Sequence, residues 1–349
     1  MRYWLGQAAL FVAVAILLLT FVNASWLAPK PAGGVKLIAH RGVYQLFDHK
    51  GIKRDSCTAR RIEPPVHDYL ENTARSMQAA AQIGADMVEI DIVPTADGRI
   101  AVFHDWTIDC RTEGKGDTRS KTLAELQALD PGFGYSADGG KSFPLRGRRK
   151  DRIPSLEEAL KALPNTPILF NFKSNDPKEA DQLAAALRAA ERNVAERRDA
   201  FYGPPAPVER IRTHFPKALR FSKVGIKDCT RDYLAYGWTS IVPESCRNGV
   251  MMIPLNYQWA FWGWPNRLIQ RMNSVGARVI VIGDYGDDGP SGLTLPEQLG
   301  EIPSSFNGYI WVDDIWTVGP ALRPNRDFRS QAQIDAAEAG LKRRREGME

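Results

Sequence analysis

Short apolar runs rich in β-branched residues alternate with helical patterns along most of the chain, and this alternation constrains the fold more than any other feature. Eight runs are expected to form strands, at residues 35–39, 87–92, 100–103, 167–172, 219–222, 250–255, 277–282 and 309–312. Helical patterns lie between them, for example over 74–83, 156–163, 179–195, 231–236 and 266–274. Alternating strands and helices form parallel sheets, and eight units that close on themselves form the (β/α)8 TIM barrel. An open doubly wound sheet ranks second, because no glycine-rich phosphate motif follows the first strand.

Composition divides the chain into three parts. Residues 1–33 are expected to be an N-terminal membrane anchor or signal segment, 34–322 the TIM-barrel catalytic domain, and 323–349 a polar tail with a basic end. The barrel segment is longer than the typical length of about 250 residues, so the surplus should lie in loops. Three stretches are interpreted as insertions, at 43–70, 131–152 and 196–207.

The N-terminal segment has the length of a membrane-spanning helix. No residue from Tyr3 to Pro29 is charged, and Trp4 and Trp26 bracket the apolar run. Their separation corresponds to roughly 33 Å of helix, which matches the hydrocarbon thickness of a bilayer. The alternative is a secretory signal that is cleaved after small residues near Ala24. Either reading predicts a membrane-anchored, extracytoplasmic (periplasmic) catalytic domain, or a secreted one.

The net charge and the cysteine content limit the class of binding partner and the cellular compartment that the sequence allows. The 46 basic and 41 acidic residues leave a net charge of +5, too dilute and interspersed for a nucleic-acid-binding protein. The four cysteines lack zinc-site spacing, and their even number fits two disulfides in an oxidising compartment, with four buried thiols as the alternative. Because Cys57 and Cys110 fall in loops at the catalytic end of the predicted barrel, we expect them to pair, which leaves Cys229 to pair with Cys246.

Polar side chains gather where the first four predicted strands end. These are His40 and Arg41, then Glu89 and Asp91, then His104, and finally Asn171 and Lys173. Strand residues two apart share one face, so both carboxylates should project into the barrel mouth, where like charges need a cation. Oxygen-rich ligands favour Ca²⁺, Mg²⁺ or Mn²⁺ over zinc, and a cation beside Arg and Lys would bind a phosphate ester.

The chain resembles the glycerophosphodiester phosphodiesterase family over about residues 35–175. The motifs that carry the resemblance are His40-Arg41-Gly42, Glu71-Asn72-Thr73, Gly84-Ala85-Asp86 with Glu89 and Asp91, residues 95–98, His104-Asp105, Arg111-Thr112 with Gly114-Lys115-Gly116, and Ile153-Pro154-Ser155-Leu156. The resemblance implies a TIM barrel that uses a divalent cation to hydrolyse glycerophosphodiesters to sn-glycerol 3-phosphate and an alcohol. It also implies His40 and His104 as the acid/base pair, Arg41 and Lys173 as phosphate ligands, and Glu89 and Asp91 as metal ligands.

One position departs from the family pattern and keeps alternatives open. Asn171 stands where the family usually has a third metal-binding Glu, so Asn171 or Glu71 is the further candidate ligand, and Glu71 could instead brace the His40-Arg41 turn. The expected substrate is a small glycerophosphodiester or a lysolipid. The rivals are a lipid phosphodiesterase of the phospholipase C or D type on the same barrel, and a catalytically impaired binding or scaffold protein.

An aromatic cluster follows the sixth predicted strand and is expected at the catalytic rim. It consists of Trp259, Phe261, Trp262 and Trp264. Such a cluster either packs its own loop, or lines the alcohol side of the pocket or touches the bilayer.

Overall fold

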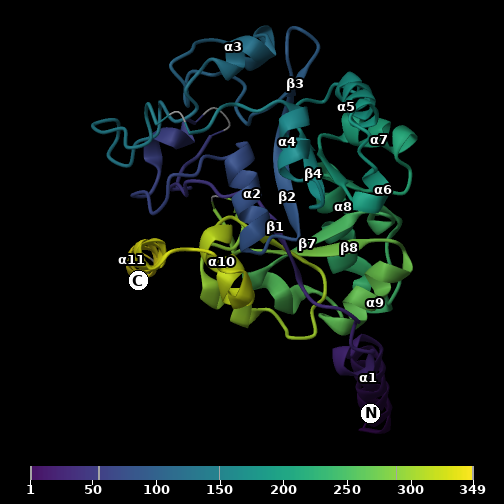
Figure 1. Ribbon diagram of the computed structural model, residues 1–349. Helices are drawn as coiled ribbons and strands as arrows, with labels where there is room; N and C mark the ends of the chain where they lie inside the picture. Colours follow the sequence, from purple (N-terminus) through teal and green to yellow (C-terminus); the bar gives the residue numbers. More distant parts are fainter. Residues whose placement is uncertain (1, 54–55, 149, 288, 348–349) are drawn as a thin grey trace.

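Eight parallel strands form a nearly closed barrel in the computed structural model, which describes residues 2–53, 56–148, 150–287 and 289–347 (Figure 1). In chain order the barrel strands are β1 (Lys36–Ala39), β2 (Met87–Pro94), β4 (Ile168–Phe172), β5 (Ala200–Gly203), β6 (Leu219–Ser222), β7 (Val250–Pro254), β8 (Arg278–Ile282) and β11 (Tyr309–Val312). They are hydrogen-bonded in the order β6-β5-β4-β2-β1-β11-β8-β7, and no ladder joins β6 to β7 among the described residues. The predicted TIM barrel is therefore confirmed.

Two predicted segments of the sheet are assigned wrongly, although the number of barrel strands is right. Residues 100–103 do not form a barrel strand, because β3 (Ile100–Val102) pairs antiparallel with β2. The tight turn at 95–98 explains this, since so short a connection joins antiparallel strands, whereas a parallel crossover needs a dozen or more residues. The missing barrel strand is β5, which lies inside the stretch 196–207 that was interpreted as an insertion. β5 contains no β-branched residue and is followed by two prolines, so its strand pattern is weak.

Helices pack around the strands as the alternating pattern requires. They are α2 (Ala74–Ile83), α4 (Leu156–Ala162), α5 (Lys178–Ala189), α6 (Val194–Arg197), α7 (Pro205–His214), α8 (Lys223–Tyr236), α9 (Asn266–Ser274) and α10 (Ile315–Leu322). The predictions for α2 and α9 match to the residue. The Thr73 side chain caps α2 by accepting a hydrogen bond from Ser76 N, and Gly84 ends the helix with a φ of 127°. The predicted helix over 179–195 is instead two helices, α5 and α6.

The barrel separates two apolar cores. The inner core fills the lower barrel with side chains from the strands, including Ile38, Met87, Leu169, Ile280 and Trp311. The outer core lies between the strands and the surrounding helices, and Leu37, Val88, Phe170 and Met77 belong to it. Neighbouring residues of one strand belong to different cores because side chains alternate along a strand. This alternation decides which polar side chains point into the barrel.

Loops at the carboxyl ends of the first strands form a cap beside the barrel mouth. The cap contains η2 (Thr58–Arg61), η3 (Thr118–Ser120) and α3 (Leu123–Gln127). The predicted disulfide Cys57–Cys110 is present, with a Cα–Cα distance of 5.4 Å, and it joins two of these loops. The predicted disulfide Cys229–Cys246 is present too, with a Cα–Cα distance of 4.6 Å, and ties α8 to the segment before β7. On the same side, β9 (Tyr285–Gly286) and β10 (Gly289–Pro290) form a small hairpin after β8.

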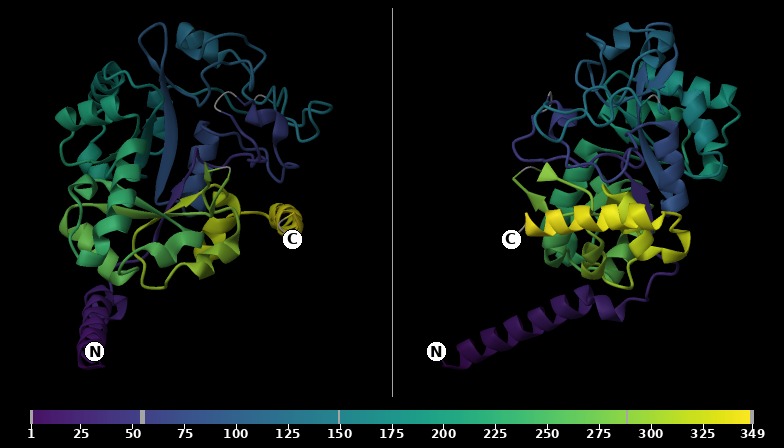
Figure 2. Two further views of the ribbon diagram at one scale, coloured as in Figure 1. Left: turned by 180° about the vertical axis from the view of Figure 1, so that it is seen from behind. Right: turned by 60° about the vertical axis from the view of Figure 1, so that its left-hand side comes forward.

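The N-terminal helix α1 (Arg2–Asn23) projects away from the barrel (Figure 2). Over Tyr3–Asn23 it is long and apolar enough to cross a membrane, with a mean hydropathy of 2.5 and none of that window buried. A short turn, η1 (Ser25–Leu27), connects it to the segment that leads into β1. The structure therefore contains one apolar N-terminal helix that the barrel itself does not cover.

The C-terminal helix α11 (Gln331–Glu346) follows η8 (Pro324–Arg326) and crosses one side of the barrel (Figure 2). It begins with a capping box at Ser330 and buries Ala337 and Leu341. Within its basic end, Arg344 forms an ion pair of 2.7 Å with the buried Asp314 at the start of α10. The basic residues are thus not all solvated, because Arg344 attaches the helix to the barrel.

Candidate active site

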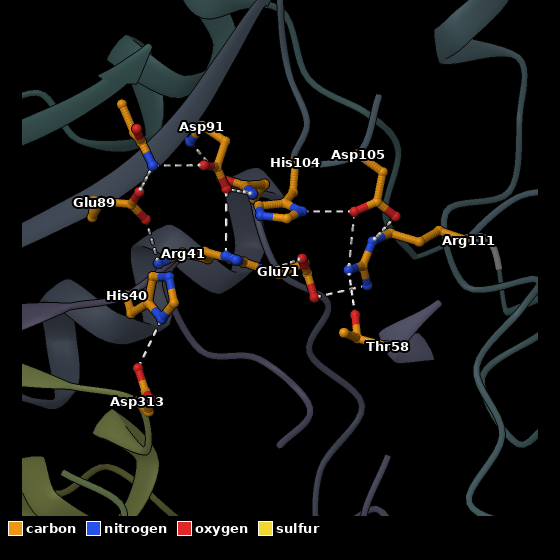
Figure 3. Close-up of polar contacts among 12 residues, drawn as sticks. His40, Arg41, Thr58, Glu71, Glu89, Asp91, His104, Asp105, Arg111 and Asp313 are labelled. Carbon is orange, nitrogen blue, oxygen red and sulfur yellow. Dashed lines mark hydrogen bonds and ion pairs between the residues drawn. The ribbon is translucent and has the colours of Figure 1, made fainter. Parts of the chain in front are cut away.

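The polar residues of the predicted site form the layer directly above the inner apolar core. His40 and Asn171 each lie two residues beyond an inner-core side chain of their own strand segment, because His40 follows Ile38 and Asn171 follows Leu169. On β2, Met87 belongs to the inner core, and Glu89 and Asp91 follow at the same spacing with no exposed surface. The carboxyl ends of the strands therefore place these groups together, at the end of a barrel where active sites are found (Figure 3).

His40 lies at the end of β1 and is held by Asp313, which directly follows β11. Its Nδ1 is 2.7 Å from Asp313 Oδ1, and Gly292 N donates a hydrogen bond to the other Asp313 oxygen. The ring also packs against Tyr44 and Trp311. With Nδ1 bound to a carboxylate, Nε2 remains as the ring nitrogen that can exchange a proton with a substrate.

His104 lies just beyond β3 and has a carboxylate partner of its own. Its Nδ1 is 2.6 Å from Asp105 Oδ1. Burial and the cations Arg41 and Lys173 lower the pKa of His104 to about 4, so the ring is neutral at neutral pH. Because β3 is a hairpin arm and not a barrel strand, His104 reaches the site from the side. The predicted convergence of the two histidines is found, although the element that carries His104 differs from the prediction.

Glu89, Asp91 and Asn171 form a compact group on the adjacent strands β2 and β4. Asn171 Nδ2 is 2.8 Å from Glu89 Oε1 and 3.0 Å from Asp91 Oδ1, so both carboxylates converge on one point. Burial and the neighbouring Asp91 raise the pKa of Glu89 to about 6. Despite its burial, Asp91 has a pKa below its usual range, because Lys173, His104 and Arg41 stabilise the charged form.

This group fits a hard divalent cation by its donor chemistry. Two buried carboxylate oxygens lie within hydrogen-bond distance of the same Asn171 nitrogen, and the repulsion that raises the pKa of Glu89 would be relieved by a cation. The number of charged metal ligands is small. The part of the chain that the structure describes contains no group of three His, Cys, Asp or Glu side chains suited to a metal ion. Glu89 and Asp91 could hold the cation, with Asn171 as a neutral third ligand.

Arg41 and Glu71 belong to a buried ion-pair network that links the barrel mouth to the cap (Figure 3). Arg41 Nη1 donates to Glu71 Oε1 at 2.9 Å, and Arg41 Nε is 3.4 Å from Asp91. The other Glu71 oxygen accepts from Arg111 Nη1 at 2.9 Å, and Arg111 Nε is 2.9 Å from Asp105. Both Glu71 oxygens are thus bound by guanidinium groups.

Two lysines line the cavity that opens beside these groups. The cavity has a volume of about 410 Å³, and its lining residues are His104, Trp106, Asn171, Phe172, Lys173, Gly203, Pro204 and Lys223. Lys173 Nζ is 3.1 Å from Asp91 Oδ1, and Lys223 is the first residue of α8. Burial and the charge of Lys173 lower the pKa of Lys223. A mouth with two ammonium groups and a neutral histidine suits an anionic substrate.

The aromatic cluster after β7 does not line this cavity. Trp264 packs against Phe306 at a centroid distance of 5.4 Å, and Trp262 Nε1 donates to Leu234 O near the end of α8. Phe261 is buried, and Trp259 is 82% exposed. None of the four aromatic residues lines this cavity, and the hydrogen bond from Trp264 Nε1 to Gln258 Oε1 fits the alternative that the cluster packs its own loop.

Sequence reasoning missed several residues of the site. Asp313 and Lys223 follow the strands β11 and β6, so inspection of every strand end would have found them. Asn72, which donates to Asp91 Oδ2 at 2.9 Å, and Arg111 were quoted in motifs without a role. Their contacts join loops 19 and 40 residues apart in the sequence, and no local pattern gives such distances.

Comparison with known proteins identifies relatives of this chain. Residues 57–209 match the Glycerophosphoryl diester phosphodiesterase family. A glycerophosphodiester phosphodiesterase of Caldanaerobacter subterraneus is 34% identical over 103 residues, which are 30% of this chain and 39% of that protein. The chain spans less than half the length of the curated relatives that it matches.

Solved structures agree on the fold. The crystal structure of a glycerophosphodiester phosphodiesterase from Agrobacterium tumefaciens superposes with a TM-score of 0.53 at 21% identity, covering 82% of this chain and 99% of that one. A phosphodiesterase of Oleispira antarctica, solved in complex with the product sn-glycerol-3-phosphate, gives a TM-score of 0.52 at 17% identity, covering 85% of this chain and 98% of that one.

Proposed function

We propose that this chain is an enzyme that hydrolyses glycerophosphodiesters to sn-glycerol 3-phosphate and an alcohol, because residues 57–209 match the Glycerophosphoryl diester phosphodiesterase family. The observation that carries the proposal is the convergence of two carboxylate-held histidines, His40 and His104, with the buried carboxylate pair Glu89 and Asp91. The product named for the Oleispira antarctica enzyme, sn-glycerol-3-phosphate, supports this substrate class.

Charge neutralisation at the phosphate is the first requirement of the reaction. A phosphodiester is a monoanion that repels nucleophiles, so its non-bridging oxygens need cationic partners as the transition state forms. Lys173, at the cavity wall, and Arg41 supply two positive charges. A divalent cation (Ca²⁺ or Mg²⁺, with Mn²⁺ as the alternative) on Glu89, Asp91 and Asn171 would supply Lewis-acid stabilisation of the same oxygens. Glu71 is assigned as the brace of Arg41 and Arg111 and not as a metal ligand, because both its oxygens are bound by them.

The two histidines transfer the protons. One ring nitrogen accepts the proton of the attacking hydroxyl, from water or from the neighbouring glycerol hydroxyl of the substrate, as the new P–O bond forms. The other donates a proton to the departing alkoxide as the old P–O bond breaks. Water as the nucleophile gives sn-glycerol 3-phosphate directly, whereas the glycerol hydroxyl gives a cyclic phosphate, which a water molecule then opens with the same two proton transfers. Asp313 and Asp105 bind Nδ1 of His40 and His104 and thereby orient Nε2 of each ring.

Turnover of glycerophosphoethanolamine by the purified full chain tests the proposal. We expect release of ethanolamine that stops with EDTA and returns with Mg²⁺ or Ca²⁺. His40→Ala and His104→Ala should each lower kcat by at least about 100-fold without unfolding the protein, because a proton transfer is lost. A wild-type chain that binds glycerophosphodiesters without turnover would instead indicate a scaffold, and full activity in EDTA would favour a metal-independent lipid phosphodiesterase.

The apolar helix α1 supports a location at a membrane. We infer that it anchors the chain in the bilayer with the barrel on the extracytoplasmic side, where the two disulfides are stable. Recovery of the full-length chain in the membrane fraction after an alkaline wash tests the anchor. A soluble product that begins near Ala24 would show that the helix is a cleaved signal.

A further inference from the structure

Exposed apolar side chains surround the place where α1 meets the barrel, at the end opposite the active site. They are Trp26, Leu27, Tyr236, Trp238, Ile241 and Trp262, and we call them the basal surface. Each is at least 40% exposed, and Ile241 and Trp26 reach 69% and 76%. Soluble domains rarely leave such a group of large apolar side chains in water, so this surface needs an occupant.

Hydrogen bonds fix the end of α1 to this surface. Asn23 Nδ2 donates to Trp238 O at 3.0 Å, and Ser25 Oγ accepts from Asn266 N at 2.9 Å. Arg271 of α9 donates to Val22 O and to Asn23 Oδ1. The basal surface therefore lies at the level where the apolar part of α1 ends.

A groove of about 450 Å³ between α1 and α9 adds positive charge at the same level. Phe21 and Val22 line it on the α1 side, and Arg267 and Arg271 on the other. Arg271 is only 7% exposed, and its recorded hydrogen bonds go to neutral acceptors. Arg267 Nε is buried without a hydrogen-bond partner. Within the described ranges no carboxylate forms an ion pair with either guanidinium, although buried charges are normally paired.

We propose that the basal surface rests on the bilayer that α1 enters, and that the groove holds the phosphate of an anionic phospholipid. The inference rests on the anchoring of α1 proposed above. Aromatic side chains at the level of a helix end are typical of the membrane–water interface, and Arg attracts anionic lipid headgroups. Apolar α1 residues on one wall and guanidinium groups on the other match the acyl chain and the phosphate of one lipid molecule.

Single cysteines report on the surface, because no free cysteine occurs among the described residues. The full chain in lipid nanodiscs would carry an environment-sensitive fluorophore on Ile241→Cys, on Phe11→Cys in the middle of α1, or on Lys141→Cys in the cap. We expect nitroxide lipids to quench the probes at 241 and 11, and iodide to quench the probe at 141. Equal quenching of the probes at 241 and 141 by iodide would overturn the proposal. So would a probe at 241 shielded from both quenchers, because a second copy or another protein would then cover the surface.

Varying the fraction of anionic lipid tests whether the groove binds a lipid phosphate. With phosphatidylglycerol titrated into phosphatidylcholine nanodiscs, Arg267→Gln should raise the phosphatidylglycerol fraction for half-maximal quenching at 241 about fivefold, the effect of one Arg near an anionic surface. The matched control Arg148→Gln, in the cap, should leave this phosphatidylglycerol fraction unchanged. If Arg267→Gln also leaves it unchanged, the groove does not bind an anionic phospholipid. In the same nanodiscs, Arg267→Gln should turn over glycerophosphoethanolamine as fast as the wild type does. Loss of activity and loss of membrane contact are therefore separate readouts. A probe at 11 that stays accessible to iodide would refute the anchor and this inference with it.

Discussion

At the scale of single residues, the orientation of His40 depends on one carboxylate that the motifs do not contain. Asp313 Oδ1 contacts His40 Nδ1 at 2.7 Å, and the Asp313 side chain is almost fully buried. Asp313→Asn would keep the shape of the side chain but lose the charge that fixes the tautomer of His40. We expect kcat to fall by about 10²- to 10⁴-fold with KM little changed, as measured by steady-state kinetics. An unchanged kcat in a folded variant would show that His40 needs no orienting partner.

Asn171 determines the charge of the proposed cation site. An amide oxygen can ligate a hard cation but brings no negative charge, so binding should be weaker than with three carboxylates. Asn171→Glu should lower the Mg²⁺ or Ca²⁺ concentration for half-maximal activity by roughly an order of magnitude, and Asn171→Ala should raise it. Titration of activity against each cation for the three proteins measures the effect. Identical half-saturation in all three would exclude Asn171 as a ligand.

The sequence predicted the site residues as far as their position on strands allowed. His40, Glu89, Asp91 and Asn171 are found in one layer because each ends or nearly ends a strand of the same barrel. Which contacts they make depends on loops from distant parts of the sequence, and for this reason the bridge from Glu71 through Arg111 to Asp105 could not be predicted.

At the scale of elements, long-range pairing again decided what the sequence could not show. One predicted barrel strand, at 100–103, is not part of the barrel, and one barrel strand, β5, was not predicted. The run at 100–103 is as apolar and β-branched as a barrel strand, but the turn before it is too short for a parallel crossover. Strand β5 lacks β-branched residues, and its neighbours β4 and β6 supply the hydrogen bonds that make it a strand. Periodicity therefore predicted the fold class, whereas pairing decided which runs take part.

The two disulfides provide a matched pair of elements with different expected roles. Cys57–Cys110 closes a loop of 53 residues and Cys229–Cys246 one of 17, so chain entropy predicts losses of about 4 and 3 kcal/mol of stability when each is replaced by serines. Only the first pair lies next to the network at the mouth, because Arg111 follows Cys110 and donates to Thr58 beside Cys57.

We therefore expect the double variant Cys57→Ser/Cys110→Ser to lose kcat as well as stability. The double variant Cys229→Ser/Cys246→Ser, its control, should lose stability alone. Urea unfolding and turnover of glycerophosphoethanolamine at a temperature where both variants are folded separate the effects. Equal retention of activity by the two variants would contradict a role of the cap in holding the site.

At the scale of the whole molecule, the two ends of the barrel face different surroundings. The carboxyl ends of the strands carry the active-site cavity, whereas the basal surface lies at the other end of the barrel. Helix α1 leaves the barrel at that end (Figure 2). If α1 enters the bilayer, the cavity opens away from it. A substrate should then arrive from the aqueous phase, and a lipid held in the same bilayer should be a poor substrate even if its headgroup fits the cavity.

Competing substrates in the same nanodiscs test this arrangement. Soluble glycerophosphoethanolamine should be hydrolysed as fast in nanodiscs as in detergent, because its path to the cavity is open. Lysophosphatidylethanolamine in the bilayer should react more than about tenfold slower than in detergent, since lifting even two methylene groups out of the bilayer costs about 1.6 kcal/mol. A short-chain lysolipid that is monomeric in water serves as the control, because it presents the same headgroup without a bilayer. Equal rates for the bilayer lysolipid and the short-chain control would show that the mouth faces the membrane.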